Sequence, residues 1–232
     1  MHIIFIAIFF MIVSLAVSST LKNKFRKYSK VGLKNNLTGG QIAELMLADH
    51  GIRDVRVTSV QGNLTDHYNP MNKTVNLSEQ VYYGKNAAAA AVASHECGHA
   101  VQHAMGYAPL KLRSALVPIQ NASGRILNII VIASIFGFGF LYSTFPIDLI
   151  LLIIIGCYSV LTLFSFITLP VEFNASSRAL VWVQERNIVD TSEYHMAKDA
   201  LKWAALTYVV AAIASLVSLL YYIMIFLGRS RD

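Results

Sequence analysis

The chain is organised around residues 87–99, which read AAAAAVASHECGH. Alanine is the best helix former, and Glu96 is the only charged residue in this proline-free run, so the stretch predicts one continuous helix. On that helix His95 and His99 lie four residues apart, and therefore on one face. Two imidazoles in this arrangement can bind one metal ion. Glu96 lies about 100° further round the helix, where it can reach a metal-bound water without being a ligand.

The pattern H-E-x-x-H is typical of zinc metallopeptidases. Zinc lowers the pKa of its bound water and polarises the scissile carbonyl, while the glutamate acts as general base. The alternative is an ordinary helix with two solvent-facing histidines. That alternative gives no reason for an acid and two histidines among small apolar residues, because buried ionisable groups need partners. We therefore predict that Glu96 is catalytic and that His95 and His99 bind Zn2+.

Two neighbours of the motif could be mistaken for further ligands. Cys97 points away from the histidine face, so we expect it to pack in the core. His103 lies about 12 Å along the helix axis from His95, which is too far to complete the same site, so we expect a surface or membrane-interface histidine. The only other cysteine is Cys157, and two cysteines of this kind do not form a disulfide framework.

The composition indicates a membrane protein. Apolar residues make up 55% of the chain and charged residues 14%, unlike an average soluble domain. The apolar residues gather in four blocks, which are Ile3 to Val17, Ile126 to Tyr142, Ile147 to Leu169 and Ala204 to Leu227. The last three approach or exceed the ~18 residues of a membrane span. The first lacks the positive start of a signal peptide, so we expect a retained anchor.

The charge distribution predicts the orientation in the membrane. The first apolar block is followed by a run of basic residues with no acid before Glu44, namely Lys22, Lys24, Arg26, Lys27, Lys30 and Lys34. By the positive-inside rule this run is cytoplasmic, and a basic linker or a lipid-headgroup contact would have the same placement. The net charge of +6 then reflects topology, and we expect no nucleic-acid partner.

A small α+β region precedes the motif helix. Residues 38–41 (TGGQ) form a capping box that opens a helix, which ends at Gly51. Short strands are predicted at 55–58, 64–68 and 74–77. The edge strand of such a sheet can bind an extended peptide through main-chain hydrogen bonds, so the candidate substrate-binding residues are His67, Tyr68, Val75 and Asn76. A polar turn around residues 66–68 is an equally good interpretation.

The third metal ligand must come from another segment. A catalytic zinc usually takes three protein ligands and a water. Glu172 follows the third apolar block, and Pro170 predicts that a helix begins there. Because this segment emerges on the side assigned to the motif, Glu172 is the predicted third ligand. The alternative is a carboxylate stabilised by the helix dipole, and the competing acids are Glu79, Glu185 and Glu193.

The predicted fold is mainly α and polytopic, with four transmembrane helices and a small α+β cytoplasmic zinc-peptidase domain. Its predicted parts are an N-terminal anchor (1–20), a cytoplasmic metallopeptidase domain (21–115), a transmembrane hairpin (116–169), a cytoplasmic helical segment carrying the third ligand (170–203) and a C-terminal transmembrane helix (204–232).

The chain resembles the YugP-like neutral zinc metallopeptidases of bacterial membranes. The resemblance lies in residues 64–70 (LTDHYNP), 94–103 (SHECGHAVQH), 169–176 (LPVEFNAS) and 204–208 (AALTY). It implies a multi-pass membrane protein with a zinc peptidase site and no defined substrate. A looser similarity runs to the gluzincins, in which an aspartate four residues after the glutamate ligand often supports a zinc histidine. Here Ser176 has that place and Asn174 is nearby, so the support of the histidines stays open.

The leading hypothesis is a multi-pass zinc metalloendopeptidase of the cell membrane with its site on the cytoplasmic side. Its expected partners are peptide or protein substrates, including membrane proteins, together with the lipid bilayer and other membrane proteins or further copies of the chain. One alternative is a catalytically weak zinc-binding scaffold or adaptor for other membrane proteases. Another is an intramembrane protease, which would need the motif inside an apolar span.

Overall fold

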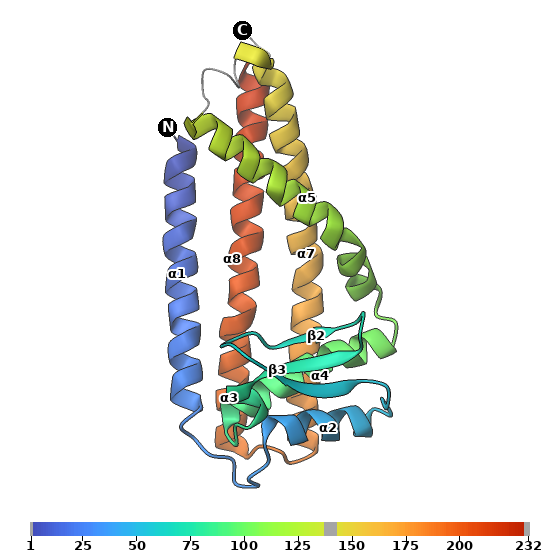
Figure 1. Cartoon of the computed structure of the whole chain (residues 1–232). Coiled ribbons are helices and arrows are strands. Elements are labelled where there is room, and N and C mark those ends of the chain that lie inside the picture. The colour runs from blue at the N-terminus through green and yellow to red at the C-terminus, as the bar shows by residue number, and fades with distance from the viewer. Residues whose placement is uncertain (1, 137–142, 230–232) are drawn as a thin grey trace. The chain divides into compact units, whose positions relative to one another are not determined.

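The computed structural model describes residues 2–136 and 143–229. Its helices are α1 (His2–Tyr28), α2 (Gly39–Asp49), α3 (Glu79–Tyr82), α4 (Ala87–Ala104), α5 (Ala108–Phe136), α7 (Ile147–Glu185) and α8 (Thr191–Arg229), and its strands are β1 (Arg56–Val60), β2 (His67–Asn69) and β3 (Thr74–Ser78) (Figure 1). Within the described residues, four helices are long and apolar enough to cross a membrane: α1, α5, α7 and α8. The predicted mainly α, polytopic class is therefore confirmed. The end of the apolar block Ile126 to Tyr142, residues 137–142, lies outside the described residues.

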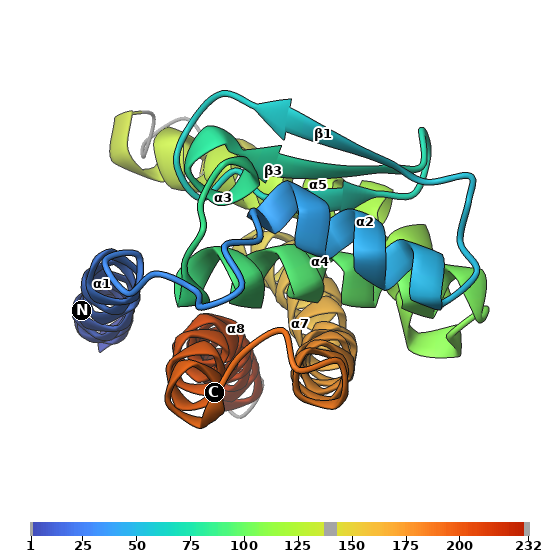
Figure 2. The ribbon, with the colours of Figure 1, turned by 90° about the horizontal axis from the view of Figure 1, so that it is seen from below.

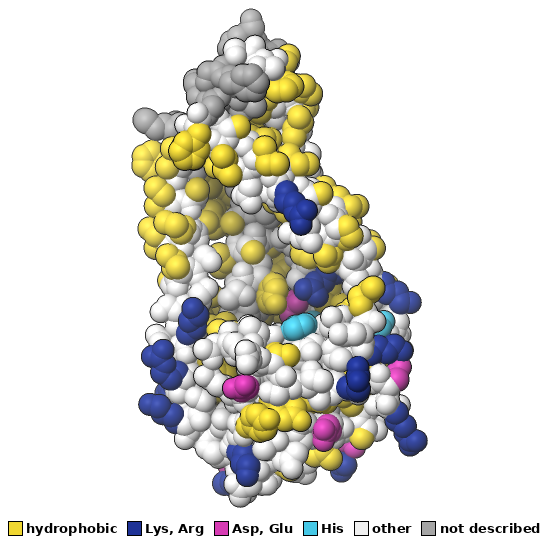
Figure 3. Space-filling view, in the orientation of Figure 1, with side chains coloured by type: hydrophobic (Ala, Val, Ile, Leu, Met, Phe, Trp, Pro, Cys, Tyr) yellow, Lys and Arg dark blue, Asp and Glu magenta, His cyan; other side chains and the backbone are white. Residues whose placement is uncertain are grey.

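The chain divides into two compact units. The first contains Met1–Leu15, Leu112–Thr168 and Tyr208–Asp232, and the second contains Ala16–Lys111 and Leu169–Thr207. In the first unit many large apolar side chains face outward, including those of Phe5, Ile129 and Leu152 (Figure 3). Such a surface is suited to the hydrocarbon core of a membrane, because moving exposed apolar side chains from water into an apolar environment lowers the free energy.

The second unit is built on a three-stranded sheet of order β1-β3-β2 within the described residues. Strand β3 lies in the centre, parallel to β1 and antiparallel to β2. Val75 and Leu77 of β3 are fully buried. The two outer strands, β1 and β2, are therefore the ones with a free edge.

Helix α4 is buried along most of its length. The alanines at its start are almost completely buried, in keeping with a helix that is packed on every side. On one side α4 lies against α2 and the sheet, and on the other it lies near the parts of α7 and α8 that belong to the second unit (Figure 2). Ala91 packs with Ala179 and Ala197, for example. Small side chains allow these helices to approach closely.

The predicted capping box of α2 is confirmed. The Thr38 hydroxyl accepts the Gln41 amide N–H at 3.2 Å, and the Gln41 side chain accepts the Thr38 N–H at 3.0 Å. The helix ends beside Gly51, whose φ of 70° is a conformation that glycine adopts without strain. Residues next to each end of α2 therefore determine where this helix begins and ends.

The predicted helix start at Pro170 is wrong, because Pro170 lies inside the continuous helix α7. A proline removes one hydrogen bond and introduces a ring clash, which disfavours a helix interior by about 3 kcal/mol. The division between the two units nevertheless falls beside this proline, between Thr168 and Leu169.

Candidate metal centre

Helix α4 carries His95 and His99 with their side chains close together on one face. The side chain of Asn86 caps the helix by accepting the Ala89 N–H at 2.9 Å. One turn separates His95 from His99, and their ring centroids lie 4.8 Å apart. His99 is buried and His95 is nearly so, so neither is an ordinary solvent-facing histidine.

Glu172 of α7 lies beside both histidines. Its Oε2 is 3.3 Å from Nε2 of His95 and 3.5 Å from Nε2 of His99, and the residue is only 2% exposed. The three donor atoms lie within 4.8 Å of one another. Two imidazole nitrogens and one carboxylate oxygen form a donor set that suits zinc and leaves one tetrahedral position for water. This group is therefore positioned to bind a metal.

The three competing acids lie elsewhere. Glu79 and Glu185 are exposed. The buried Glu193 accepts the backbone N–H of Asp190 at 2.7 Å and that of Lys34 at 3.2 Å, so it organises the start of α8. Among the described residues, these acids do not join the histidine pair.

Gly98 explains how α4 and α7 approach closely enough to share a site. A Cβ atom placed on Gly98 would lie 2.6 Å from the backbone oxygen of Ala175, a distance that real side chains essentially never show. Glycine therefore permits the contact. Because Ala175 is one helical turn after Glu172, the same contact sets the distance of Glu172 from the histidines.

Each histidine is held through its other ring nitrogen. Nδ1 of His95 lies 3.1 Å from the Ser176 hydroxyl, and Nδ1 of His99 lies 3.0 Å from Oε1 of Gln102. Both Nε2 atoms thus face Glu172. The sequence pointed to Ser176, which has the position of the supporting aspartate in gluzincins. Gln102 was not identified from the sequence. Its spacing of three residues from His99 on one helix was the available signal.

Glu96 lies next to this group and is held by the sheet. The residue is 8% exposed, and its Oε2 accepts the backbone N–H of Tyr68 at 3.0 Å. Tyr68 pairs with Val75 of β3, but its N–H points away from β3 and toward α4. The edge of β2 therefore lies beside the acid of the motif.

The four candidate substrate-binding residues separate in the structure. His67 and Tyr68 lie on the edge strand β2. Val75 and Asn76 lie on the central strand β3, are buried, and have neighbouring strands on both sides. A central strand has no free edge for a peptide, so the edge-strand argument does not apply to Val75 and Asn76, and their role in substrate binding stays a prediction.

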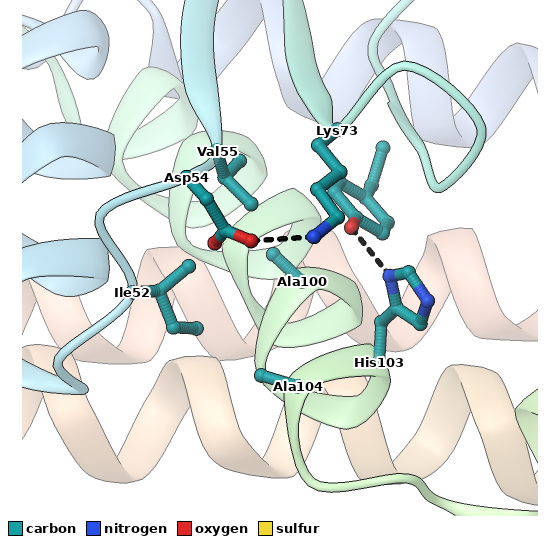
Figure 4. Close-up of a pocket in the computed structure, with 8 residues that line it drawn as sticks. Ile52, Asp54, Val55, Lys73, Ala100, His103 and Ala104 are labelled. Atoms are coloured by element: carbon teal, nitrogen blue, oxygen red, sulfur yellow. Dashed lines mark hydrogen bonds and ion pairs between the residues drawn. The ribbon is translucent and has the colours of Figure 1, made fainter.

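Tyr68 also lines a cavity of ≈ 370 Å³ near the C-terminal end of α4 (Figure 4). Its hydroxyl lies 2.7 Å from Nδ1 of His103, and burial, followed by the charge of Asp54, raises the pKa of the phenol. Lys73, which also lines this cavity, forms an ion pair with Asp54 at 2.5 Å. His103, predicted to be a surface or membrane-interface histidine, is partly buried and contacts the tyrosine whose N–H holds Glu96.

Two further reactive side chains have packing roles. Asp66 accepts the backbone N–H of Ser78 at 2.7 Å and its hydroxyl at 3.0 Å, which anchors the segment before β2, and burial raises the pKa of this carboxyl. Cys97 is fully buried against α2, as expected. Burial and the nearby Glu96 raise the pKa of its thiol, so it is a poor metal-binding thiolate.

Comparison with known proteins agrees with this geometry. Residues 3–227 match the family described as "Putative neutral zinc metallopeptidase". A relative from Bacillus subtilis (strain 168), described as "Putative membrane protease YugP", is 42% identical over 213 residues, which cover 91% of each chain. No solved structure matches the chain. With a match over nearly its whole length and a metal-binding group of the corresponding kind, the chain belongs to this family of neutral zinc metallopeptidases.

Proposed function

We propose that the protein is a membrane-embedded zinc metalloendopeptidase of the HExxH, gluzincin-like type, which hydrolyses peptide bonds at the cytoplasmic face of the membrane. The observation that carries the proposal is the group of His95, His99 and Glu172 with the buried Glu96 beside it. A structural zinc site would have four protein ligands and would need no neighbouring general base.

Each residue of the site then has one task. His95, His99 and Glu172 would hold the ion, and bound zinc supplies activation of the attacking water and polarisation of the scissile carbonyl. The Glu96 carboxylate accepts the proton of that water and returns it to the leaving amine. The N–H of Tyr68 fixes one oxygen of this carboxylate at 3.0 Å, which limits its motion while the proton moves.

The edge strand β2 supplies a place for the substrate. The outer edge of β2 faces the acid of the motif, because the Tyr68 N–H donates to Glu96. An extended peptide that lies beside His67 and Tyr68 on this side would therefore pass close to Glu96. The cavity beside Tyr68 and His103 would accept a side chain of that peptide. Peptide or protein chains that reach the membrane surface are the proposed substrates.

The charge distribution supports a cytoplasmic site. The basic residues after the first apolar block belong to the second unit, as do α4 and Glu172. In the proposed arrangement residues 21–115 and 170–203 are cytoplasmic, while residues 1–20, 116–169 and 204–232 are the membrane-embedded parts. The motif helix α4 is not one of the candidate spans among the described residues, which argues against an intramembrane protease.

The variant Glu96→Gln tests this function. We expect it to abolish cleavage of a peptide library by the purified protein and to leave bound zinc near stoichiometric, because Glu96 is not part of the ligand group. The glutamine keeps an oxygen that can accept the Tyr68 N–H, so the fold is preserved.

Metal analysis and library digestion are measured on the same samples. Loss of zinc in Glu96→Gln would show that Glu96 has been given the wrong role. Absence of cleavage by the zinc-loaded wild type would favour a scaffold or adaptor over an enzyme.

A further inference from the structure

We infer that Gln102 is a positioning residue that joins the two halves of the metal centre. It determines which ring nitrogen of His99 carries the proton, and it forms hydrogen bonds with the turn of α7 that contains Glu172. The inference rests on the metal site of the proposed function and assigns it a supporting residue outside the motif.

The orientation of the Gln102 amide follows from its neighbours. Its Nε2 donates to the backbone oxygen of Val171 at 2.8 Å and to Oδ1 of Asn174 at 3.0 Å. A backbone carbonyl is only an acceptor, so the NH2 group must be the part that faces α7. The oxygen Oε1 is then the atom 3.0 Å from Nδ1 of His99.

This orientation determines the tautomer of His99. An amide oxygen only accepts, so Nδ1 of His99 must carry the hydrogen and donate it. The lone pair of the neutral ring is consequently on Nε2, the atom that faces Glu172 and the proposed metal. The hydroxyl of Ser176 beside His95 can donate or accept, so it does not impose a tautomer in the same way.

The same amide fixes the other half of the centre. Val171 and Asn174 lie one residue before and two residues after Glu172 on α7. Asn174 is held in turn by Arg178, whose Nε donates to Oδ1 at 2.8 Å. Gln102 therefore links the helix of the histidines to the turn of the glutamate through hydrogen bonds that span 69 and 72 residues of sequence.

The burial of Gln102 makes the loss of any one of these hydrogen bonds unfavourable. Gln102 has no exposed surface, and both NH2 hydrogens and the carbonyl oxygen are engaged. A buried amide that loses a partner is strongly disfavoured, so the three contacts are formed together. Displacing one helix would leave a buried polar group without a partner.

Two substitutions separate an effect on His99 from a general loss of packing. Gln102→Met keeps the length of the side chain and loses all three hydrogen bonds. Asn174→Ala removes one of the two donations from Gln102 to α7 and leaves Oε1 of Gln102 as the acceptor for Nδ1 of His99. Gln184→Met, at an exposed position of α7, is the matched control.

The measurement is zinc affinity of the full-length protein in detergent, by competition with a chromophoric chelator. We expect Gln102→Met to bind zinc about 10- to 100-fold more weakly than wild type. Asn174→Ala should bind zinc more weakly than wild type but more tightly than Gln102→Met, and Gln184→Met should stay near wild type. Wild-type affinity in Gln102→Met, or equal weakening in Gln102→Met and Gln184→Met, would overturn the inference.

Two checks keep the result interpretable. Circular dichroism and the melting temperature of the metal-free proteins establish folding. If Gln102→Met does not fold, Asn174→Ala replaces it, and unchanged zinc affinity there would overturn the inference. A wild type that binds no zinc would instead refute the proposed function.

Discussion

At the scale of single residues, the contacts behind the metal-facing atoms distinguish this centre. His95 and His99 direct the same atom, Nε2, toward Glu172, but a hydroxyl holds one ring and an amide oxygen holds the other. An amide oxygen accepts only, whereas a hydroxyl can also donate, so the two ligands are constrained differently. In the inferred arrangement, Nδ1 of His99 carries the hydrogen whether or not a metal is bound.

A second residue-scale feature is Asp49, which attaches the end of α2 to the end of α7. Arg186 donates to Asp49 from Nε at 2.8 Å and from Nη2 at 3.1 Å, and Trp182 donates from Nε1 at 2.9 Å. These hydrogen bonds, first from Arg186 and then from Trp182, lower the pKa of the Asp49 carboxyl. The ionised form is therefore favoured in the folded protein.

We predict that Asp49→Asn lowers the melting temperature at neutral pH and that the difference from wild type disappears in acid. Because the folded-state pKa lies below the unfolded value of about 4, the stabilisation is complete above that value and is lost as pH falls through the folded-state pKa. The measurement is thermal unfolding of metal-free protein in detergent between neutral pH and pH ~3. Glu44→Gln, an exposed acid on the same helix, is the control, and a pH-independent difference for Asp49→Asn would contradict the assignment.

At the scale of elements, the metal centre depends on the contact between α4 and α7 within the second unit. Gly98 allows the backbones to approach, and Gln102 bridges them. A metal bound by residues of both helices would add a further link that exists only in the folded state. Such binding stabilises the fold by RT ln(1 + L/Kd), which grows with the logarithm of the free ligand concentration L.

Glu172→Ala is therefore predicted to lower zinc affinity steeply and to remove the rise in melting temperature that zinc gives to the wild type. Both are measured in detergent, with and without a chelator. Glu185→Ala is the matched control, because this glutamate is exposed near the end of the same helix. If Glu172→Ala kept full zinc binding, the third ligand would have been misassigned.

Glu193→Ala is predicted to leave zinc affinity unchanged, because Glu193 is not part of the group that can hold the metal. The hydrogen bonds of Glu193 to the Lys34 and Asp190 amides predict a lower melting temperature for this variant with and without zinc. A loss of stability in that variant does not implicate Glu193 in metal binding.

At the scale of the whole molecule, the orientation in the membrane is the main prediction. We expect positions 24 and 73 to be cytoplasmic and both chain ends to face outward, because six basic residues follow the first apolar block and four spans return the chain to the outside. Arg229 and Arg231 at the far end oppose this arrangement weakly.

Cysteine accessibility in intact cells measures this orientation. Both native cysteines are buried, and Cys157→Ser removes the one in a candidate span. A membrane-impermeant maleimide should then label Phe145→Cys, an exposed site between the second and third apolar blocks that this orientation places outside. It should not label Lys73→Cys until the cells are opened. Labelling of position 73 from outside would reverse the topology and with it the side of the proposed site.

Some features of this protein were predictable from the sequence alone. The polytopic, mainly α class follows from the length of four apolar blocks, and the capping box of α2 follows from residues 38–41. The spacing of His95 and His99 predicts that they share a helix face. All of these are local properties, because hydrophobic length, end caps and the helical repeat depend on residues that are neighbours in the chain.

The remaining features depend on contacts between segments that are distant in the chain. The strand order β1-β3-β2 places Val75 and Asn76 in the buried central strand. The five residues of β3 do not by themselves determine which strands will pair with it. Pro170 marks a possible helix start, but packing and the surrounding helix override that local preference. In the sequence Gln102 has no distinguishing feature within the motif helix. Its hydrogen-bond acceptors lie on α7, 69 and 72 residues away in the chain. Tertiary structure decides these points because a buried polar group takes its partner from whichever segment packs against it.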